Sequence, residues 1–200
     1  MSSNRRTTVR ALATAAATVV MAGGMVLVPS AASAAPQDCA YMGYGSGPDQ
    51  LGLQWDADEQ WVADTINAYR AQNGLPALLP TTALARPTMW GALDSALRGF
   101  SPSDHIDTRG MGPAERAEFC SDTGYPVGTP IGEINYWGEG GTAEDPYYYG
   151  SGRAAFEWWR NSPGHNALML STDYTHFGVG WAYLGVNAEQ GFWVVMFGTS

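Results

Sequence analysis

The chain has 200 residues, 45% of them hydrophobic, and carries 10 basic against 19 acidic side chains, for a formal net charge of −9 at pH 7. This length fits one domain with a single sizeable core. The acidic balance excludes nucleic acid and anionic membrane surfaces as favourable partners, because both repel a negatively charged protein.

Residues 1–34 have the order of segments that a secretory signal peptide has. Three arginines precede an apolar run at 11–28, and small residues follow around a predicted cleavage site after Ala34. No later stretch is apolar enough to give a stable membrane span. We therefore expect a secreted, extracellular chain that keeps seven arginines, no lysine and all 19 acidic residues.

The first element predicted after the cleavage site is an amphipathic helix within 55–74. Residues 35–54 are rich in Gly, Pro and Ser without an apolar period, so we expect an irregular segment there and the folded domain over 55–200. Asp56 and Glu59 have the spacing of a capping pair, and Gly74 can end the helix. The apolar side chains at helical spacing are Trp61, Val62, Thr65, Ile66 and Tyr69.

A second helix is predicted over 82–98, with Pro87 at its start or at a kink. Its apolar residues fall on one side of the helix, which we expect to be buried. They are Leu84, Leu93, Ala96 and Leu97.

Polar residues that could form a functional site follow the second helix. His105 and Asp107 lie in "SDHIDTRGM", before a glycine-rich turn, and Glu133 lies in "PIGEINYW", the most apolar stretch of the middle region. A carboxylate is costly to bury there unless it is paired or bound to a metal. Each residue also has an ordinary interpretation: a surface or capping histidine, and a glutamate bonded to a backbone turn.

The stretch 137–152 is rich in glycine and contains three consecutive tyrosines, residues 147–149. One interpretation is a flexible connector. The other is that these tyrosines overhang a cleft and contact a ligand, because tyrosine offers a large contact area with few torsions to immobilise.

A third helix is predicted over 153–161, with Phe156, Trp158 and Trp159 as buried candidates. The run from Ser162 to Gly164 contains proline and glycine and is expected to stop it. His165 follows directly, and its ordinary interpretation is a helix cap.

The C-terminal region changes its apolar period from about four to two. Large residues from Phe177 to Tyr183 alternate with Gly178, Gly180 and Ala182, and "GFWVVMFG" supplies a second apolar run. This pattern predicts an antiparallel hairpin with one bulky, buried face and one face of small residues. Helices first and strands last, without βαβ alternation, predict an α+β fold with a short antiparallel sheet.

Two cysteines, Cys39 and Cys120, follow the predicted cleavage site. In an oxidising exterior, a single disulfide between them is the favoured interpretation over two free thiols. Neither has a second cysteine at metal-binding spacing, so a cysteine-based zinc site is excluded.

Several motifs together resemble the CAP superfamily of SCP-like extracellular domains. They are "NAYRAQNGLP", "DHIDTRGM", Arg116 with a following Gly-Tyr pair, "GEIN", "WWRNSPGH" and "DYTHFGVG". The chain looks like the bacterial branch of this superfamily, which also holds cysteine-rich secretory proteins, insect venom antigens and plant pathogenesis-related proteins.

The resemblance implies an α-β-α sandwich and a cleft that carries His105, Glu133 and His165. Ser162 and Asp173 occupy places where animal and plant members carry a glutamate and a histidine, and Asp107 completes the cleft candidates. His176 falls in a variable position of the strand motif, so we expect it to be exposed.

Two imidazoles and a carboxylate, His105, Glu133 and His165, are the ligand set for zinc or another divalent metal, with one position left open. Without metal, the same groups can hydrogen-bond a ligand or perform acid–base chemistry. We therefore rank first a secreted binding module for a small extracellular ligand such as a lipid, a peptide or a cell-wall fragment. A metal-dependent hydrolase or protease and a passive structural domain remain alternatives.

Overall fold

The computed structural model describes residues 55–120, 125–126, 128–140, 150–184 and 190–199. The predicted signal peptide, the segment 35–54 and the tyrosines 147–149 lie outside these ranges. The elements are α2 (Ala57–Gln72), β1 (Leu79–Pro80), α3 (Thr82–Arg98), α4 (Pro113–Cys120), β2 (Gly132–Glu139), α5 (Gly152–Asn161), α6 (Pro163–Met169), β3 (His176–Leu184) and β4 (Gln190–Gly198). No helix in the described part of the chain is long and apolar enough to cross a membrane.

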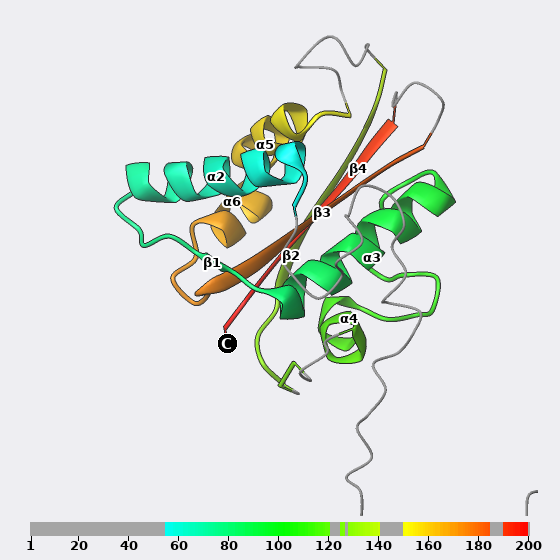
Figure 1. Ribbon diagram of the computed structural model, residues 1–200, viewed down its shortest axis with the longest axis horizontal. Helices are drawn as coiled ribbons and strands as arrows, with labels where there is room; N and C mark the ends of the chain where they lie inside the picture. Colours follow the sequence, from blue (N-terminus) through cyan, green and yellow to red (C-terminus); the bar gives the residue numbers. More distant parts are fainter. Residues whose placement is uncertain (1–54, 121–124, 127, 141–149, 185–189, 200) are drawn as a thin grey trace, which may run out of the picture. The chain divides into compact units, whose positions relative to one another are not determined.

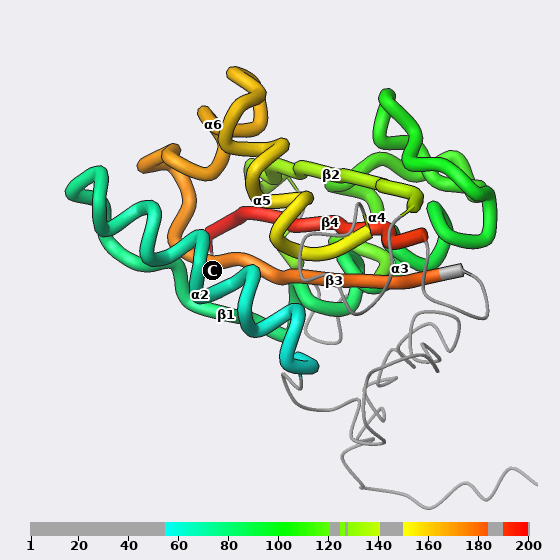
Figure 2. The backbone as a smooth tube through the Cα atoms, turned by 90° about the horizontal axis from the view of Figure 1, so that it is seen from above, coloured from blue at the N-terminus to red at the C-terminus, as the bar shows by residue number. Residues whose placement is uncertain are grey.

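The four strands form one sheet in the order β1-β3-β4-β2. β4 pairs antiparallel with both β3 and β2, which confirms the predicted C-terminal hairpin. The short strand β1 pairs parallel with β3 through Leu79 and His176, so the sheet is mixed, while the pairings of β3, β4 and β2 are antiparallel as expected. Figure 2 shows β4 between β3 and β2, which leaves β2 at an open edge.

Helices cover both faces of the sheet, which confirms the predicted α-β-α sandwich. α2, α5 and α6 lie on one face, and α3 and α4 lie on the other (Figure 1). Successive side chains of β4 enter opposite cores, because side chains alternate across a strand. Trp193, Val195 and Phe197 join the α2 side, whereas Phe192, Val194 and Met196 join the α3 side.

The small-residue face of β3 is buried against α3. A Cβ atom on Gly178 would lie 2.6 Å from the Ala85 backbone nitrogen, and one on Gly180 would lie 2.5 Å from the Thr88 carbonyl carbon. Real side chains cannot approach a backbone this closely, so the glycines allow α3 to pack directly on the strand. The period-2 pattern therefore gives two buried faces, one bulky and one small.

The first helix agrees with its sequence pattern in detail. The Asp56 side chain accepts from the Glu59 backbone N–H at 2.8 Å, and the Glu59 side chain accepts from the Asp56 backbone N–H at 3.1 Å. This reciprocal pair is a capping box, which satisfies two N–H groups at the helix start. Val62 and Ile66 are fully buried on the face that packs into the core.

Two apolar residues expected in the core are exposed: Leu97 at 70% and Trp158 at 48%. Leu97 lies in the last turn of α3, and Trp158 faces outward while its neighbour Trp159 is fully buried. Adjacent helical residues point about 100° apart, so one of two consecutive tryptophans must leave the core face. Helical spacing alone therefore predicted a wider buried face than α3 and α5 have.

Ser162-Pro163-Gly164 both ends α5 and begins α6. Pro163 is the first residue of α6, where its fixed φ suits a helix and its missing N–H is not needed. The sequence prediction took this run only as a stop signal. Sequence patterns also identified neither β2, the strand that carries Glu133, nor α4.

Candidate binding site at the edge of β2

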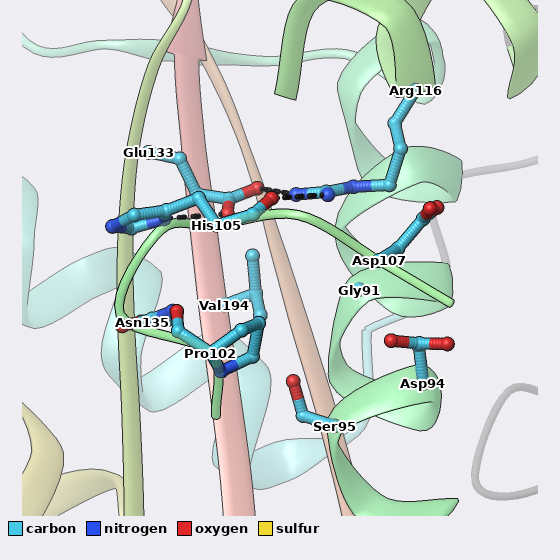
Figure 3. Close-up of a pocket in the computed structure, with 10 residues that line it drawn as sticks. All are labelled: Gly91, Asp94, Ser95, Pro102, His105, Asp107, Arg116, Glu133, Asn135 and Val194. Atoms are coloured by element: carbon cyan, nitrogen blue, oxygen red, sulfur yellow. Dashed lines mark hydrogen bonds and ion pairs between the residues drawn. The ribbon is translucent and has the colours of Figure 1, made fainter. Parts of the chain in front are cut away.

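The candidate site joins side chains from three elements on the α3 side of the sheet. Glu133 comes from β2, Arg116 from α4, and His105 from the loop between α3 and α4. The Glu133 carboxylate accepts from His105 Nδ1 at 2.8 Å through Oε1 and forms an ion pair with Arg116 Nη2 through Oε2. In Figure 3, Glu133 lies between the His105 ring and the Arg116 guanidinium.

Burial makes this ion pair strong. Glu133 is 8% exposed and Arg116 is 2% exposed, so little water screens their charges. The arginine offsets the cost of burying the carboxylate. Because an ionised carboxylate only accepts hydrogen bonds, His105 Nδ1 carries the proton that Glu133 accepts, and Nε2 takes no part in this contact.

His105 has an unusual backbone conformation. Its φ of 61° is the only positive φ of a non-glycine residue in the described ranges. Arg116 Nη1 donates to the His105 carbonyl at 2.8 Å and to the Met111 carbonyl at 3.1 Å, which holds the loop in this conformation. Strained residues of this kind are often found at functional sites, where the surrounding structure compensates for the strain.

His165 lies in α6, on the other side of the sheet edge, and is half-buried. Its Nδ1 atom is 2.7 Å from Ser162 Oγ, which fixes the ring orientation. Burial lowers the pKa of His165, and the neighbouring His105 lowers it further. The two imidazoles are therefore close enough to interact electrostatically, and His165 is neutral at pH 7.

Behind the His105–Glu133 pair is a small pocket between α3, β2 and β4, with a cavity volume of about 10 Å³, the space of about one water molecule. Its lining includes Asp94, Asp107 and Arg116 (Figure 3). Arg116 Nε is buried and has no hydrogen-bond partner among the described residues. The pocket has room for a water molecule but not for an organic ligand.

The other candidate residues have separate surroundings. Asp107 is buried, and its carboxylate accepts from Trp90 Nε1 at 2.8 Å and from the Met111 N–H at 2.9 Å, so it organises the histidine loop. Asp173 is exposed in the turn between α6 and β3. His176 begins β3 and is half-buried rather than exposed, so that expectation was wrong. Cys120 is fully buried at the end of α4, while Cys39 lies outside the described residues.

The observed contacts do not fit a three-ligand zinc site. Within the described ranges, no group of three or more His, Cys, Asp or Glu side chains is arranged to hold a metal ion. Both oxygens of Glu133 are engaged, one by His105 and the other by a cation, Arg116. A metal would have to replace these partners or bind beside the arginine, which like-charge repulsion disfavours. Metal binding by His105, Glu133 and His165 stays a prediction.

Sequence reasoning did not assign Arg116 to the site. A carboxylate buried in an apolar stretch requires a cation. Only seven arginines and no lysine follow the predicted cleavage site, so the sequence offers few candidates for this cation, and Arg116 is one of them. Arg116 was quoted only as part of a motif. Its role depends on α4, which places the guanidinium against β2.

Comparisons with known proteins agree with this architecture. An outer surface protein from Borrelia burgdorferi has a TM-score of 0.55 at 18% identity, over 74% of this chain and 96% of that one. An extracellular protein with an SCP domain from Bacillus anthracis has a TM-score of 0.52 at 20% identity, over 78% of this chain and 44% of that one. At these identities, the similarity establishes the fold alone.

A short sequence match is closer. The uncharacterized membrane protein YlbC of Bacillus subtilis is 56% identical over 34 residues, which are 17% of this chain and 10% of that protein. The chain therefore spans a small part of this relative's length. The family model described as the cysteine-rich secretory protein family matches residues 63–197, well over half of the sequence. The chain therefore belongs to this family, which is the CAP superfamily that its histidine-loop and Ser-Pro-Gly-His motifs resemble.

Proposed function

We propose that the protein is a secreted binding module that holds a small extracellular ligand at the open edge of β2, with His105 and His165 as its polar contacts. The observation that supports this most is the buried Arg116–Glu133–His105 chain. It fixes the His105 ring, with Nδ1 as donor to Glu133, and leaves Nε2 out of this contact. A rigidly held His105 ring beside the neutral His165 imidazole suits recognition of hydroxyl or amide groups.

A binding role fits these contacts better than metal-dependent hydrolysis. A hydrolase of that kind needs a metal-bound water and open coordination positions. Here the carboxylate that would complete the ligand set is already paired with an arginine. The proposed function does not depend on zinc, and zinc binding is tested separately.

The test compares small molecules that are retained by the exported protein and extracted for mass spectrometry. His105→Asn removes the imidazole while keeping a residue type that tolerates positive φ. His176→Asn is the matched control, since the same change is made on β3. We expect His105→Asn to lose retained molecules that the wild type and the control keep. If all three folded proteins retain the same molecules, the proposed site is wrong.

A zinc titration by calorimetry separates the metal prediction from this proposal. The proteins are wild type, Glu133→Gln and His165→Ala. Zinc binding that both substitutions abolish would establish the ligand set inferred from the resemblance. Zinc binding unaffected by either would place the metal elsewhere.

A further inference from the structure

A partly exposed aromatic cluster includes His165 of the histidine pair. Trp158 of α5 is 48% exposed, and its ring centroid is 4.7 Å from that of His165, at an interplanar angle of 53°. The ring of Tyr136, on β2, also contacts Trp158: the two ring centroids are 5.8 Å apart, at an interplanar angle of 50°. We call these three residues the aromatic shelf.

The shelf is held in place by the core beneath it. Trp159, the residue next to Trp158, is fully buried, and its Nε1 donates to the Asn135 carbonyl of β2 at 2.9 Å. Tyr136 follows Asn135 directly and packs against the core on the α2 side. α5 is thereby fixed to the edge strand, so Trp158 and Tyr136 have a defined relative position. An exposed tryptophan that its neighbours hold rigidly costs little entropy on binding.

Charge indicates which ligand class suits the shelf. Arg116 neutralises the Glu133 carboxylate, and the lowered pKa of His165 keeps its ring uncharged at pH 7. Glu133 and His165 therefore offer little attraction to an ion, and the charges of Glu157 and Arg160 on α5 are paired with each other. A flat apolar face next to neutral donors and acceptors matches a sugar ring, whose C–H face is apolar and whose rim carries hydroxyl groups.

We propose that the aromatic shelf of Trp158, Tyr136 and His165 binds a neutral pyranose sugar, which stacks on Trp158 and directs its hydroxyl groups toward the histidine pair. This inference rests on the proposed function and names the ligand class for it. Tyr136 flanks the stacked ring, and His105 Nε2 and His165 supply hydrogen-bond partners at its rim. Free sugars and the sugars of a glycan chain share this chemistry.

The test uses a soluble tetramer of β-1,4-linked N-acetylglucosamine, the corresponding glucose tetramer and both monosaccharides, titrated into the full exported chain by calorimetry. We expect the wild type to bind at least one tetramer. Trp158→Ala should weaken this binding about tenfold or more, whereas Trp158→Phe should recover part of it because the aromatic face remains. Binding of the tetramer without the monosaccharide would identify a glycan chain, and equal binding of both would identify a free sugar.

Trp137→Ala is the matched control. Trp137 is 41% exposed on the same strand as Tyr136, but it stacks with Phe192 on the opposite side of the sheet. We expect this variant to bind within about twofold of the wild type. Circular dichroism of each variant checks that the fold is retained.

Two results would overturn the inference: no binding of any of the four sugars by the folded wild type, or equal affinity in wild type and Trp158→Ala. Neither result affects the proposed function, which His105→Asn tests through retained molecules. Sugar binding that is lost in Trp158→Ala and kept in His105→Asn would support the shelf and contradict the histidine site.

Discussion

Arg116 and Glu133 form a buried ion pair between α4 and β2, and a third residue, His105, depends on both. Each partner is nine-tenths or more buried, so neither charge can be left to water if the other is removed. Arg116 also binds the carbonyls of His105 and Met111. One guanidinium therefore compensates the carboxylate and fixes the backbone of the histidine loop.

Removing Arg116 alone should be costly to stability. Arg116→Met leaves Glu133 buried without a cation, and we expect the free energy of unfolding to fall by about 3 to 5 kcal/mol. The double variant with Glu133→Gln should recover much of this loss, because no unpaired charge remains. Urea denaturation of wild type, Arg116→Met, Glu133→Gln and the double variant forms a double-mutant cycle. Strictly additive effects of the two single changes on the free energy of unfolding would contradict the pairing.

Glu59 is a second buried carboxylate, with surroundings unlike those of Glu133. It is 1% exposed, and its oxygens accept from the backbone N–H groups of Asp56 and Trp181, both at 3.1 Å. Burial raises its pKa to about 8, with a further contribution from the charge of Asp56, and outweighs the two hydrogen bonds, which lower it. The neutral acid is therefore the main form at pH 7.

This raised pKa predicts a pH dependence of stability. The folded protein keeps the Glu59 proton that the unfolded chain releases above its ordinary pKa of 4.5. Stability from this group is complete below pH 4.5 and is lost as the pH rises toward 8. Relative to wild type, the free energy of unfolding of Glu59→Gln should gain up to about 5 kcal/mol over this range. Unfolding at pH 5, 7 and 9 measures the difference.

The exposed Glu157→Gln is the control for this experiment. Glu157 lies on the surface of α5 next to Arg160, so its substitution should change stability by less than about 0.5 kcal/mol at each pH. A Glu59→Gln difference that stays constant with pH would contradict the raised pKa.

Contact between α3 and β3 depends on the absence of side chains on one face of the strand. Gly178 and Gly180 lie against the backbone of α3 near Ala85 and Thr88. Two aromatic residues of the same strand region, Phe177 and Trp181, pack on the opposite core instead. Both faces of the hairpin are therefore buried, each against a different hydrophobic core.

Adding a methyl group on that face should separate the two elements. We expect Gly180→Ala to lower the free energy of unfolding by about 3 kcal/mol, because the new Cβ would overlap the backbone at Thr88. Gly164→Ala is the control: nothing lies within 4 Å of its added Cβ, and in α6 alanine should be neutral or stabilising by up to about 1 kcal/mol. Urea denaturation measures both, and equal effects would contradict direct packing of α3 on β3.

At the scale of the whole molecule, the predicted disulfide would connect the chain before α2 to the end of α4. Cys120 is fully buried at the C-terminus of α4, where a free thiol would be protected from most reagents. A bridge from Cys39 would close a loop of about 80 residues and stabilise the fold by up to about 4 to 5 kcal/mol.

Intact-mass measurement tests this bridge. The exported protein is unfolded and alkylated without a reductant, and we expect no alkylated cysteine. After reduction, two should be alkylated, and the free energy of unfolding should fall. Two alkylated thiols before reduction would show that the disulfide prediction is wrong.

The sequence by itself determined the elements whose signals are local. The capping box of α2, the helical spacing of α3 and α5, and the alternation of β3 and β4 all arise from neighbouring residues along the chain. The family and its sandwich fold followed from short motifs around His105 and His165. Burial of Glu133 was also expected, because its neighbours in sequence are apolar.

Only the tertiary structure decided which groups meet. The Arg116 partner of Glu133 lies 17 residues away on another element, and the exposure of Trp158 depends on which face of α5 reaches the sheet. Ser162 to Gly164 could end a helix or begin one, and the packing of Met169 in the core accompanies the second outcome. Propensity and periodicity act over a few residues, whereas pairing of buried charges and choice of the buried face depend on contacts between distant segments.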